Sequence, residues 1–306
     1  MNPSGPSRPA AGFFSARRKL ILVWVVTALV LLGLVTVAVV RTGPAAGTDF
    51  LAGPQNQRQE HAAAPAPQTP SPEALAAQAA VALDADIQRI LTENSGYRIG
   101  VVLADTRGGE RRSYGDGSEF VAASTAKIIT AAAYYHLVET GEKSLDVPLG
   151  SYDAAFQLKA MVNASSNDAW LLLMQDIGYP RLIDYAASIR ISYDPEQNLL
   201  TPAEMAELLK QLSTGKLLNA EHTQELLGYM QQTNNERLIP AAVGPDITVQ
   251  HKYGELGGYV HDAAVLTSGE RSYALAIYTW GEDGESEERL NMIHELAGVV
   301  TKAMLE

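Results

Sequence analysis

The chain has 306 residues, of which 46% are hydrophobic, enough for one large domain or two small ones. Its formal net charge is −12, and the absence of cysteine excludes disulfides, thiol catalysis and thiolate metal sites. An acidic chain of this kind is a poor candidate for binding nucleic acid.

The first 41 residues differ from the rest, because they carry five basic residues and no acidic one. Residues 20–40 form an uncharged run of 21 residues, which is long enough to span a bilayer once. The basic residues just before it predict that residues 1–19 are cytoplasmic and that the rest of the chain lies outside the cell membrane. A cleaved signal peptide is the alternative, and the length of the run favours an anchor. Residues 41–72, rich in proline and alanine, are expected to be a tether.

Residues 73–306 are expected to form one folded domain. It begins with a helical pattern that follows Ser71 and ends near Gly96, and a hairpin of residues 97–105 and 110–114 comes next. A helix with apolar or small residues on nearly every side follows, over residues 124–139, and should be buried at the domain centre. Further elements are five helices at residues 153–160, 167–176, 180–188, 202–212 and 220–231, strands at 247–253, 259–266 and 272–280, and a closing helix at 287–304.

Strands at both ends of this order, with helices between them, predict an α+β fold. One antiparallel sheet of five strands is expected to be completed by both ends of the chain. The N-terminal and C-terminal helices should pack beside each other on one face of that sheet, and the intervening helices should form an inserted lobe.

Ser124 and Lys127 lie one turn apart at the start of the central helix. A serine hydroxyl attacks a substrate when an adjacent base takes its proton, and a helix N-terminus favours the negative charge that develops beside it. The same spacing recurs at Ser213 and Lys216, in a segment typical of an ordinary helix end. Spacing alone therefore does not assign a nucleophile, and an N-cap serine beside a solvated lysine is the plain alternative.

Two further elements carry polar side chains suited to catalysis. Ser165 could relay a proton and Asn167 could hold an amide or a lysine, although both residue types are also suited to capping the helix that starts there. Lys252, at the end of a predicted strand, could hold a substrate carboxylate, and Gly254 would let a ligand approach the strand backbone. A solvated lysine before a turn is the alternative for this last element.

In this order the three elements resemble the S-x-x-K, S-D-N and K-T-G motifs of class A β-lactamases and penicillin-binding proteins. The resemblance covers about residues 71–306 and implies a β-lactamase/transpeptidase-like fold. It implies that Ser124 is the nucleophile and Lys127 its activating partner. It also implies that Ser165 is the proton-relay hydroxyl, Asn167 a ligand of the substrate amide, and Lys252 an electrostatic anchor.

The segments around the motifs extend this resemblance. Residues 234–240 are similar to the segment that carries a carboxylate-binding arginine in many class A enzymes, which places Arg237 in that role. The backbone N–H groups of Ser124 and of Glu255, just after Gly254, would form the oxyanion hole. Residues 201–206 look like the helix start that closes the family's omega loop, and residues 261–264 look like the strand after the K-T-G turn.

Three departures from the family pattern concern substrate binding and turnover. Ser166 replaces the aspartate of S-D-N, and Tyr253 replaces the small hydroxyl residue of K-T-G, so that a ring stands where substrate would lie. The glutamate that deacylates the family's acyl-enzyme has no clear match: Asp194 stands nearest, with Glu196 beside it. Because aspartate is one methylene shorter and the loop looks short, acylation is better supported than hydrolytic turnover.

The resemblance implies an acyl-serine hydrolase that opens β-lactam rings through a covalent Ser124 acyl-enzyme, with no cofactor. A D,D-peptidase acting on peptidoglycan peptides has the same chemistry, and a non-catalytic relative that binds a wall peptide or a partner protein is the reading from another class. The six histidines show no zinc-protease spacing, and no G-x-S-x-G element is present, so neither a metal site nor a Ser-His-Asp hydrolase is expected. The expected partners are a small β-lactam or a wall peptide and the membrane, and the chain is expected to be a monomer.

Overall fold

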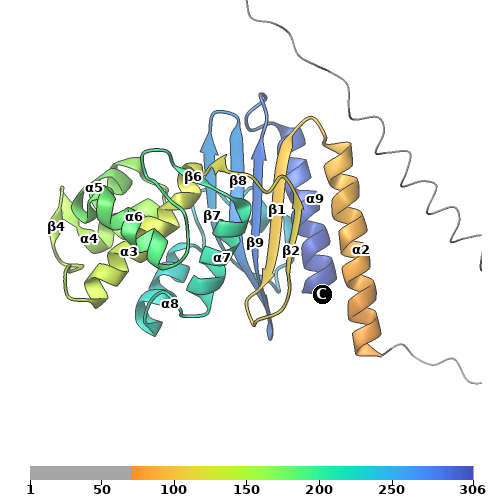
Figure 1. Cartoon of the computed structure of the whole chain (residues 1–306), viewed down its shortest axis with the longest axis horizontal. Coiled ribbons are helices and arrows are strands. Elements are labelled where there is room, and N and C mark those ends of the chain that lie inside the picture. The colour runs from red at the N-terminus through yellow and green to blue at the C-terminus, as the bar shows by residue number, and fades with distance from the viewer. Residues whose placement is uncertain (1–70, 306) are drawn as a thin grey trace, which may run out of the picture. The chain divides into compact units, whose positions relative to one another are not determined.

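The computed structural model describes residues 71–305, which form a sheet with helices on both of its faces and a helical lobe at one end (Figure 1). The strands are β1 (Arg98–Asp105), β2 (Arg111–Gly115), β3 (Phe120–Val121), β4 (Pro148–Leu149), β5 (Tyr152–Asp153), β6 (Leu199–Leu200), β7 (Thr248–Leu256), β8 (Tyr259–Ser268) and β9 (Arg271–Trp280). The α-helices are α2 (Pro72–Glu93), α3 (Lys127–Glu139), α4 (Ala154–Val162), α5 (Asn167–Ile177), α6 (Tyr179–Ser188), α7 (Pro202–Ser213), α8 (Ala220–Tyr229) and α9 (Glu287–Met304). Two short 3₁₀ helices are η1 (Ala123–Ala126) and η2 (Ile239–Ala242).

The predicted N-terminus, membrane anchor and all but the end of the predicted tether lie outside the described residues. Within residues 71–305, none of the helices combines the length and the apolar character needed to cross a membrane.

The five long strands form one antiparallel sheet in the order β2-β1-β9-β8-β7, which confirms the predicted sheet. Strand β1, from the start of the domain, pairs with β9, from its end, over the whole length of β1. Both ends of the described chain therefore complete the same sheet, and β7, which carries Lys252, is one of its edges.

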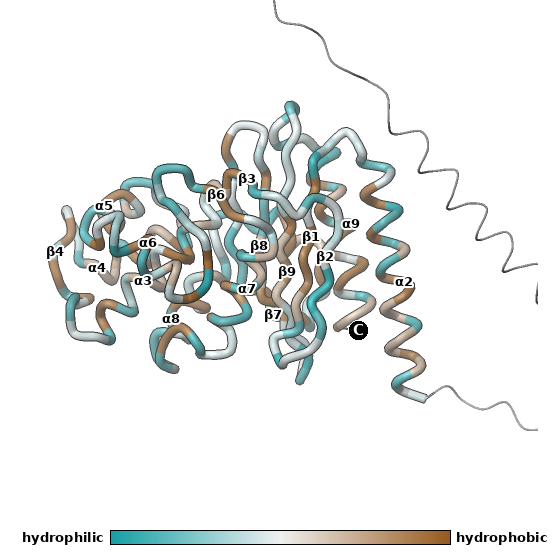
Figure 2. The backbone as a smooth tube through the Cα atoms, viewed as in Figure 1, coloured by the Kyte–Doolittle hydropathy of each residue, from teal (hydrophilic) through white to brown (hydrophobic). Residues whose placement is uncertain are grey.

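Helices α2 and α9 lie beside each other on one face of this sheet, as predicted (Figure 1). Hydrophobic and hydrophilic residues alternate along both helices (Figure 2), so each has an apolar face for the sheet. Leu83, Ile87 and Ile90 of α2 and Ile293 and Leu296 of α9 are at most 1% exposed. Burying a side chain of this size stabilises a fold by about 1.5–3 kcal/mol.

The opposite face of the sheet is covered by α7, which packs against β1, β8 and β9. Thr201 caps this helix and Glu204 completes a capping box, so its first turn has partners for its backbone N–H groups. Gly100 on β1 makes the approach feasible, because a Cβ there would meet the Pro202 ring at 2.7 Å. The helix thus reaches the strand only because that strand position has no side chain.

Helix α3 forms the centre of the helical lobe and contacts α4, α5, α6 and α8. Ten of its thirteen residues are buried, which confirms that the central helix is enclosed. Three consecutive alanines, residues 131–133, keep one stretch of the helix narrow so that its neighbours can approach closely. Lys127 is therefore fixed at the first turn of the most enclosed helix of the lobe.

The structure differs from the sequence-based expectation at the start of this helix. Ser124 lies in the 3₁₀ turn η1, and α3 begins at Lys127. The two residues of β3 pair with those of β6, which ties the chain before Ser124 to the chain before α7. A two-residue strand has no periodic pattern of side chains, and so this pairing leaves no signal in the sequence.

Candidate active site

The turn η1 holds Ser124 between the sheet and the helical lobe. Ala123, just before the serine, adopts a left-handed conformation with φ of 50°, which is uncommon for a residue with a side chain. Asn198 holds this segment, because its carbonyl accepts the Ala122 N–H at 2.8 Å and its side-chain amide donates to the Ala123 carbonyl at 3.2 Å. Ser124 remains partly exposed, so its hydroxyl is accessible from solvent.

Lys127 is fully buried, and its ammonium group lies among neutral oxygen atoms. Nζ donates to Ser124 Oγ at 2.9 Å, to the Ser165 carbonyl at 2.7 Å and to Asn167 Oδ1 at 2.8 Å. No described carboxylate forms an ion pair with it. Burial without a counter-charge lowers the pKa of Lys127 to about 8. The site therefore places an ammonium group that loses its proton more readily than usual in direct contact with a serine hydroxyl.

Ser165 lies on the turn between α4 and α5, in a left-handed conformation with φ of 54°. Its Oγ lies between two ammonium groups, 3.3 Å from Lys127 Nζ and 3.0 Å from Lys252 Nζ. Ser166, where the family motif has aspartate, caps α5 by accepting a hydrogen bond from the Ala169 N–H. Capping explains Ser166 fully, whereas the position of Ser165 suits a hydroxyl that passes protons.

Lys252 and Gly254 lie on the same side of edge strand β7, opposite the turn that holds Ser124. Nζ of Lys252 donates to Ser165 Oγ and, at 2.9 Å, to the Tyr253 carbonyl. Burial, and then the nearby charge of Lys127, lowers the pKa of Lys252 to about 7. A Cβ on Gly254 would lie 3.0 Å from the Ser124 backbone nitrogen, so the strand approaches the serine closely.

The side chains of the two remaining predicted site residues lie outside this cluster. The side chain of Arg237 is 61% exposed, and its guanidinium group forms an ion pair with Glu285. Glu255 follows Gly254 on the strand, and its carboxylate accepts a hydrogen bond from the Asn235 amide at 2.8 Å. Burial and the charge of Glu285 raise the pKa of Glu255 above its usual range. No hydrogen bond within residues 71–305 links the Arg237 side chain to the lysines.

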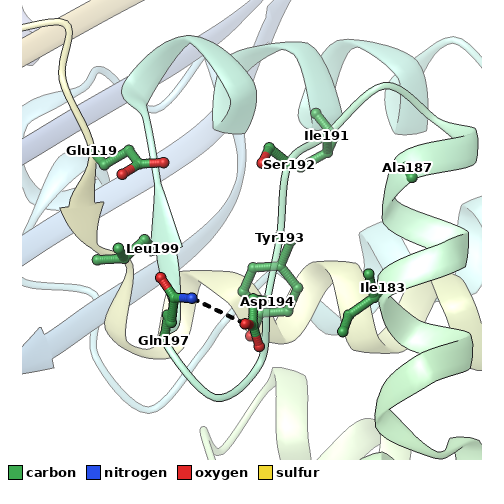
Figure 3. Close-up of a pocket in the computed structure, with 9 residues that line it drawn as sticks. All are labelled: Glu119, Ile183, Ala187, Ile191, Ser192, Tyr193, Asp194, Gln197 and Leu199. Atoms are coloured by element: carbon green, nitrogen blue, oxygen red, sulfur yellow. Dashed lines mark hydrogen bonds between the residues drawn. The ribbon is translucent and has the colours of Figure 1, made fainter.

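Asp194 lies in the loop between α6 and β6 and lines a cavity of about 300 Å³ (Figure 3). One carboxylate oxygen accepts the Glu196 N–H at 2.9 Å and the other accepts from the Gln197 amide at 3.1 Å. The cavity is lined by Glu119, Ile183, Ala187, Ile191, Ser192, Tyr193, Asp194, Gln197 and Leu199. None of these residues belongs to the cluster around Ser124. The Asp194 carboxylate therefore stabilises the loop in which it lies and does not contact the cluster.

Several residues that shape the site were not predicted from the sequence. The indole of Trp170 lies 5.0 Å from Lys127 Nζ, at a distance suited to a cation–π contact, and is held by a hydrogen bond to Thr130. Asn198, with φ of 52°, holds the segment before Ser124. Asparagine is the residue type most tolerant of this conformation after glycine, but it occurs in many loops, so the type alone gives little signal.

A second polar cluster lies behind Lys252 on β7 and β8. His251 is fully buried, and its Nδ1 lies 2.9 Å from Asp262 Oδ1 while its Nε2 faces Glu236 at 3.1 Å. Burial opposes the charge on His251, but the Asp262 carboxylate outweighs it and raises the pKa to about 9. The histidine therefore carries a charge at neutral pH and ties the two strands together next to Lys252.

Comparison with known proteins identifies the family of this chain. The sequence model of the beta-lactamase enzyme family matches residues 82–304. Beta-lactamase CTX-M-8 of Citrobacter amalonaticus is 25% identical over 251 residues, which cover 69% of this chain and 86% of that protein.

Solved structures of this family have the same fold. A mutant of PBP-A, in an acyl-enzyme complex with penicillin G, matches with a TM-score of 0.66 and 22% identity over 73% of this chain and 96% of its own. An ancestral class A beta-lactamase matches with a TM-score of 0.67 and 24% identity over 72% of this chain and 100% of its own. The chain belongs to the beta-lactamase enzyme family and is a serine hydrolase of the class A type.

Proposed function

We propose that Ser124 opens β-lactam rings by forming a covalent acyl-enzyme, with Lys127 as the base that activates it. The observation that carries this proposal is the 2.9 Å contact between Lys127 Nζ and Ser124 Oγ at a buried site with no counter-charge. With a pKa of about 8, roughly a tenth of the Lys127 side chains are neutral at pH 7. That fraction is sufficient for general-base catalysis, whereas an exposed lysine would be almost fully charged.

The chemical step follows from these contacts. Ser124 Oγ attacks the lactam carbonyl carbon and transfers its proton to neutral Lys127, forming a C–O bond. The C–N bond of the ring then breaks, and the proton passes from Lys127 through the hydroxyl of Ser165 to the departing nitrogen. A neutral Lys127 no longer repels the charge on Lys252, and in its protonated form Lys252 helps Ser165 to release that proton.

The same geometry supports roles for the neighbouring groups in holding the substrate. Asn167 accepts a hydrogen bond from Lys127 through Oδ1, but the residue remains exposed to solvent, as a ligand for the substrate amide would be. Gly254 brings the backbone of β7 against the Ser124 nitrogen, which supports the N–H groups of Ser124 and Glu255 as the oxyanion hole. Arg237 would contact a substrate carboxylate only after leaving Glu285.

Hydrolysis of the acyl-enzyme needs a base for water, and the supply of that base is the weak point of the site. Both carboxylate oxygens of Asp194 are engaged within its own loop, and Glu196 is exposed. We therefore propose that the acyl-enzyme is long-lived. Slow release is equally compatible with a D,D-peptidase that passes the acyl group to an amine, so peptide and β-lactam substrates must be compared directly.

The placement of the enzyme rests on the sequence. We propose that residues 20–40 anchor the chain in the cell membrane, with residues 1–19 in the cytoplasm. Residues 41–72 would then connect the anchor to a monomeric catalytic domain, residues 73–306, outside the membrane. Membrane fractionation of the expressed full chain tests this, and a soluble mature chain beginning after residue 40 would contradict it.

Labelling with a fluorescent penicillin tests the catalytic proposal. Ser124→Ala should abolish the covalent label on a denaturing gel, because it removes the acylated oxygen. Ser213→Ala is the matched control: its hydroxyl bonds only to the Lys210 carbonyl at the end of α7, and the label should be retained. A Ser124→Ala variant that labels like wild type would refute the assignment. A chromogenic cephalosporin then separates turnover from trapping.

A further inference from the structure

The ammonium group of Lys252 is covered by an aromatic ring. Its Nζ lies 3.9 Å from the centre of the Tyr253 ring, and the whole side chain has no exposed surface. Its hydrogen bonds go to the Ser165 hydroxyl and the Tyr253 carbonyl, both neutral. The face of a tyrosine ring attracts a cation, so the ring occupies part of the space beside Lys252 Nζ in which an anion would otherwise bind.

The Tyr253 ring is held in this position from its far end. Its hydroxyl donates to Asn234 Oδ1 at 2.8 Å. The Asn234 amide in turn donates to the Ala164 carbonyl at 3.0 Å, one residue before Ser165. A chain of hydrogen bonds therefore runs from strand β7 of the sheet to the helical lobe. Moving the ring away from Lys252 would break the first of these bonds.

The other cation predicted to receive a substrate carboxylate is also engaged. Arg237 is paired with Glu285, and Glu255 adds a further carboxylate beside Gly254. The charges of Glu285 and Glu255 lie close enough to interact, as the raised pKa of Glu255 indicates. This end of the site consequently presents acidic groups and a covered lysine to an incoming molecule.

We propose that Tyr253 is a specificity-determining residue that excludes a substrate carboxylate from Lys252. The proposal rests on the proposed function in taking Ser124 as the residue to be acylated. It implies that the site prefers acyl donors whose group at this end is uncharged, an ester or an amide, over those with a carboxylate. Benzylpenicillin, which has a carboxylate next to its lactam nitrogen, should then gain no affinity from that carboxylate.

Equilibrium binding separates this preference from the chemistry of acylation. In a Ser124→Ala background, calorimetry would compare the dissociation constants of benzylpenicillin and its methyl ester. With Tyr253 in place the acid should bind no better than the ester. Tyr253→Thr should make the acid the tighter ligand by about tenfold, because a charge-assisted hydrogen bond to Lys252 becomes available.

Three further variants control this comparison. Tyr253→Phe keeps the ring but removes its hydrogen bond to Asn234, so it should shift the ratio towards the acid by less than Tyr253→Thr does. Tyr273→Thr removes a half-buried tyrosine from strand β9, away from the lysines, and should also leave the ratio unchanged. If Tyr253→Thr does not fold, Asn234→Ala frees the far end of the ring and should shift the ratio in the same direction by a smaller factor.

Two results would overturn the proposal: a strong preference for the acid with Tyr253 in place, or no gain for the acid in the folded Tyr253→Thr variant. Undetectable binding of both compounds to that variant counts as no gain. Mass spectrometry with Ser124 intact tests the proposed function separately. If no variant is acylated, the catalytic proposal fails while the binding ratio still decides the role of Tyr253.

Discussion

Replacing Lys127 by methionine, which has a similar volume, should slow acylation strongly without a large loss of stability. Lowering the pKa of Lys127 from 10.5 to about 8 corresponds to roughly 3 kcal/mol of unfavourable free energy in the folded state at neutral pH. The substitution removes this cost, but it also removes the three shortest hydrogen bonds of Nζ, each worth about 1 kcal/mol. The two effects nearly cancel, so the unfolding free energy at pH 6.5 should change little.

The dependence on pH is the sharper part of this prediction. The folded pKa lies below the unfolded one, so the cost of the charge is fully present below pH 8 and is relieved as the pH rises towards 10.5. Between pH 6.5 and 9.5, wild type should therefore gain about 2 kcal/mol relative to Lys127→Met. Urea unfolding at both pH values measures this gain. An unchanged difference between the two proteins would show that Lys127 titrates like an exposed lysine.

Acylation by benzylpenicillin, followed by mass spectrometry, tests the catalytic half of the same prediction. Lys127→Met should slow it by about 10²–10⁴, the usual contribution of a general base. In wild type the rate should rise with pH and level off above about pH 8, as the amine loses its proton. Lys143→Met is the matched control, because this lysine pairs with Asp176 within the helical lobe and should not affect acylation.

Three other substitutions test the supporting structure. Asp194→Asn should leave the lifetime of the acyl-enzyme unchanged in mass spectrometry; rapid cephalosporin turnover that this variant loses would instead make Asp194 the deacylating base. Asn198→Ala should slow acylation about tenfold, since it removes the hydrogen bond to the Ala123 carbonyl, and a rate like that of wild type would exclude this positioning role. His251→Gln should destabilise the protein most below pH 6.5. The raised pKa of His251 means that its charged form stabilises the fold there, and this stabilisation is lost as the pH rises past 9. Equal destabilisation at pH 6 and pH 10 in urea unfolding would refute this.

The sequence predicted the elements whose side chains repeat with a regular period. Helix α9 occupies the predicted residues, and α2 and β1 were placed within a few residues of their bounds, because their apolar positions recur along one face. The grouping of Ser124, Lys127, Ser165 and Lys252 was anticipated through the family resemblance. Spacing alone did not distinguish Ser124 from Ser213, and the burial of α3 is what separates them in the structure.

The remaining features depend on partners that are distant in sequence. The position of the Tyr253 ring is set by Asn234 and that of Ala123 by Asn198, and neither pair has a characteristic spacing. The orientation of Asp194 follows from hydrogen bonds inside an irregular loop, which has no period to recognise. Sequence patterns therefore located the residues that carry the chemistry, but not the residues, such as Asn234 and Asn198, that hold the site in position through hydrogen bonds.

The electrostatic arrangement of the site explains why the residues that hold the two lysines are neutral. Lys127 and Lys252 share the hydroxyl of Ser165 and are both buried, and neither has a carboxylate partner among the described residues. A carboxylate beside Lys127 would stabilise the fold but would raise the pKa of the amine, so that it could no longer take the Ser124 proton at neutral pH. Neutral oxygens and aromatic rings hold the lysines in place without this effect. Burying Lys127 without a carboxylate partner lowers the stability of the fold but keeps the pKa of the amine low enough for it to act as a base. Neutral groups such as Asn167 and Trp170 must therefore hold the ammonium group in place.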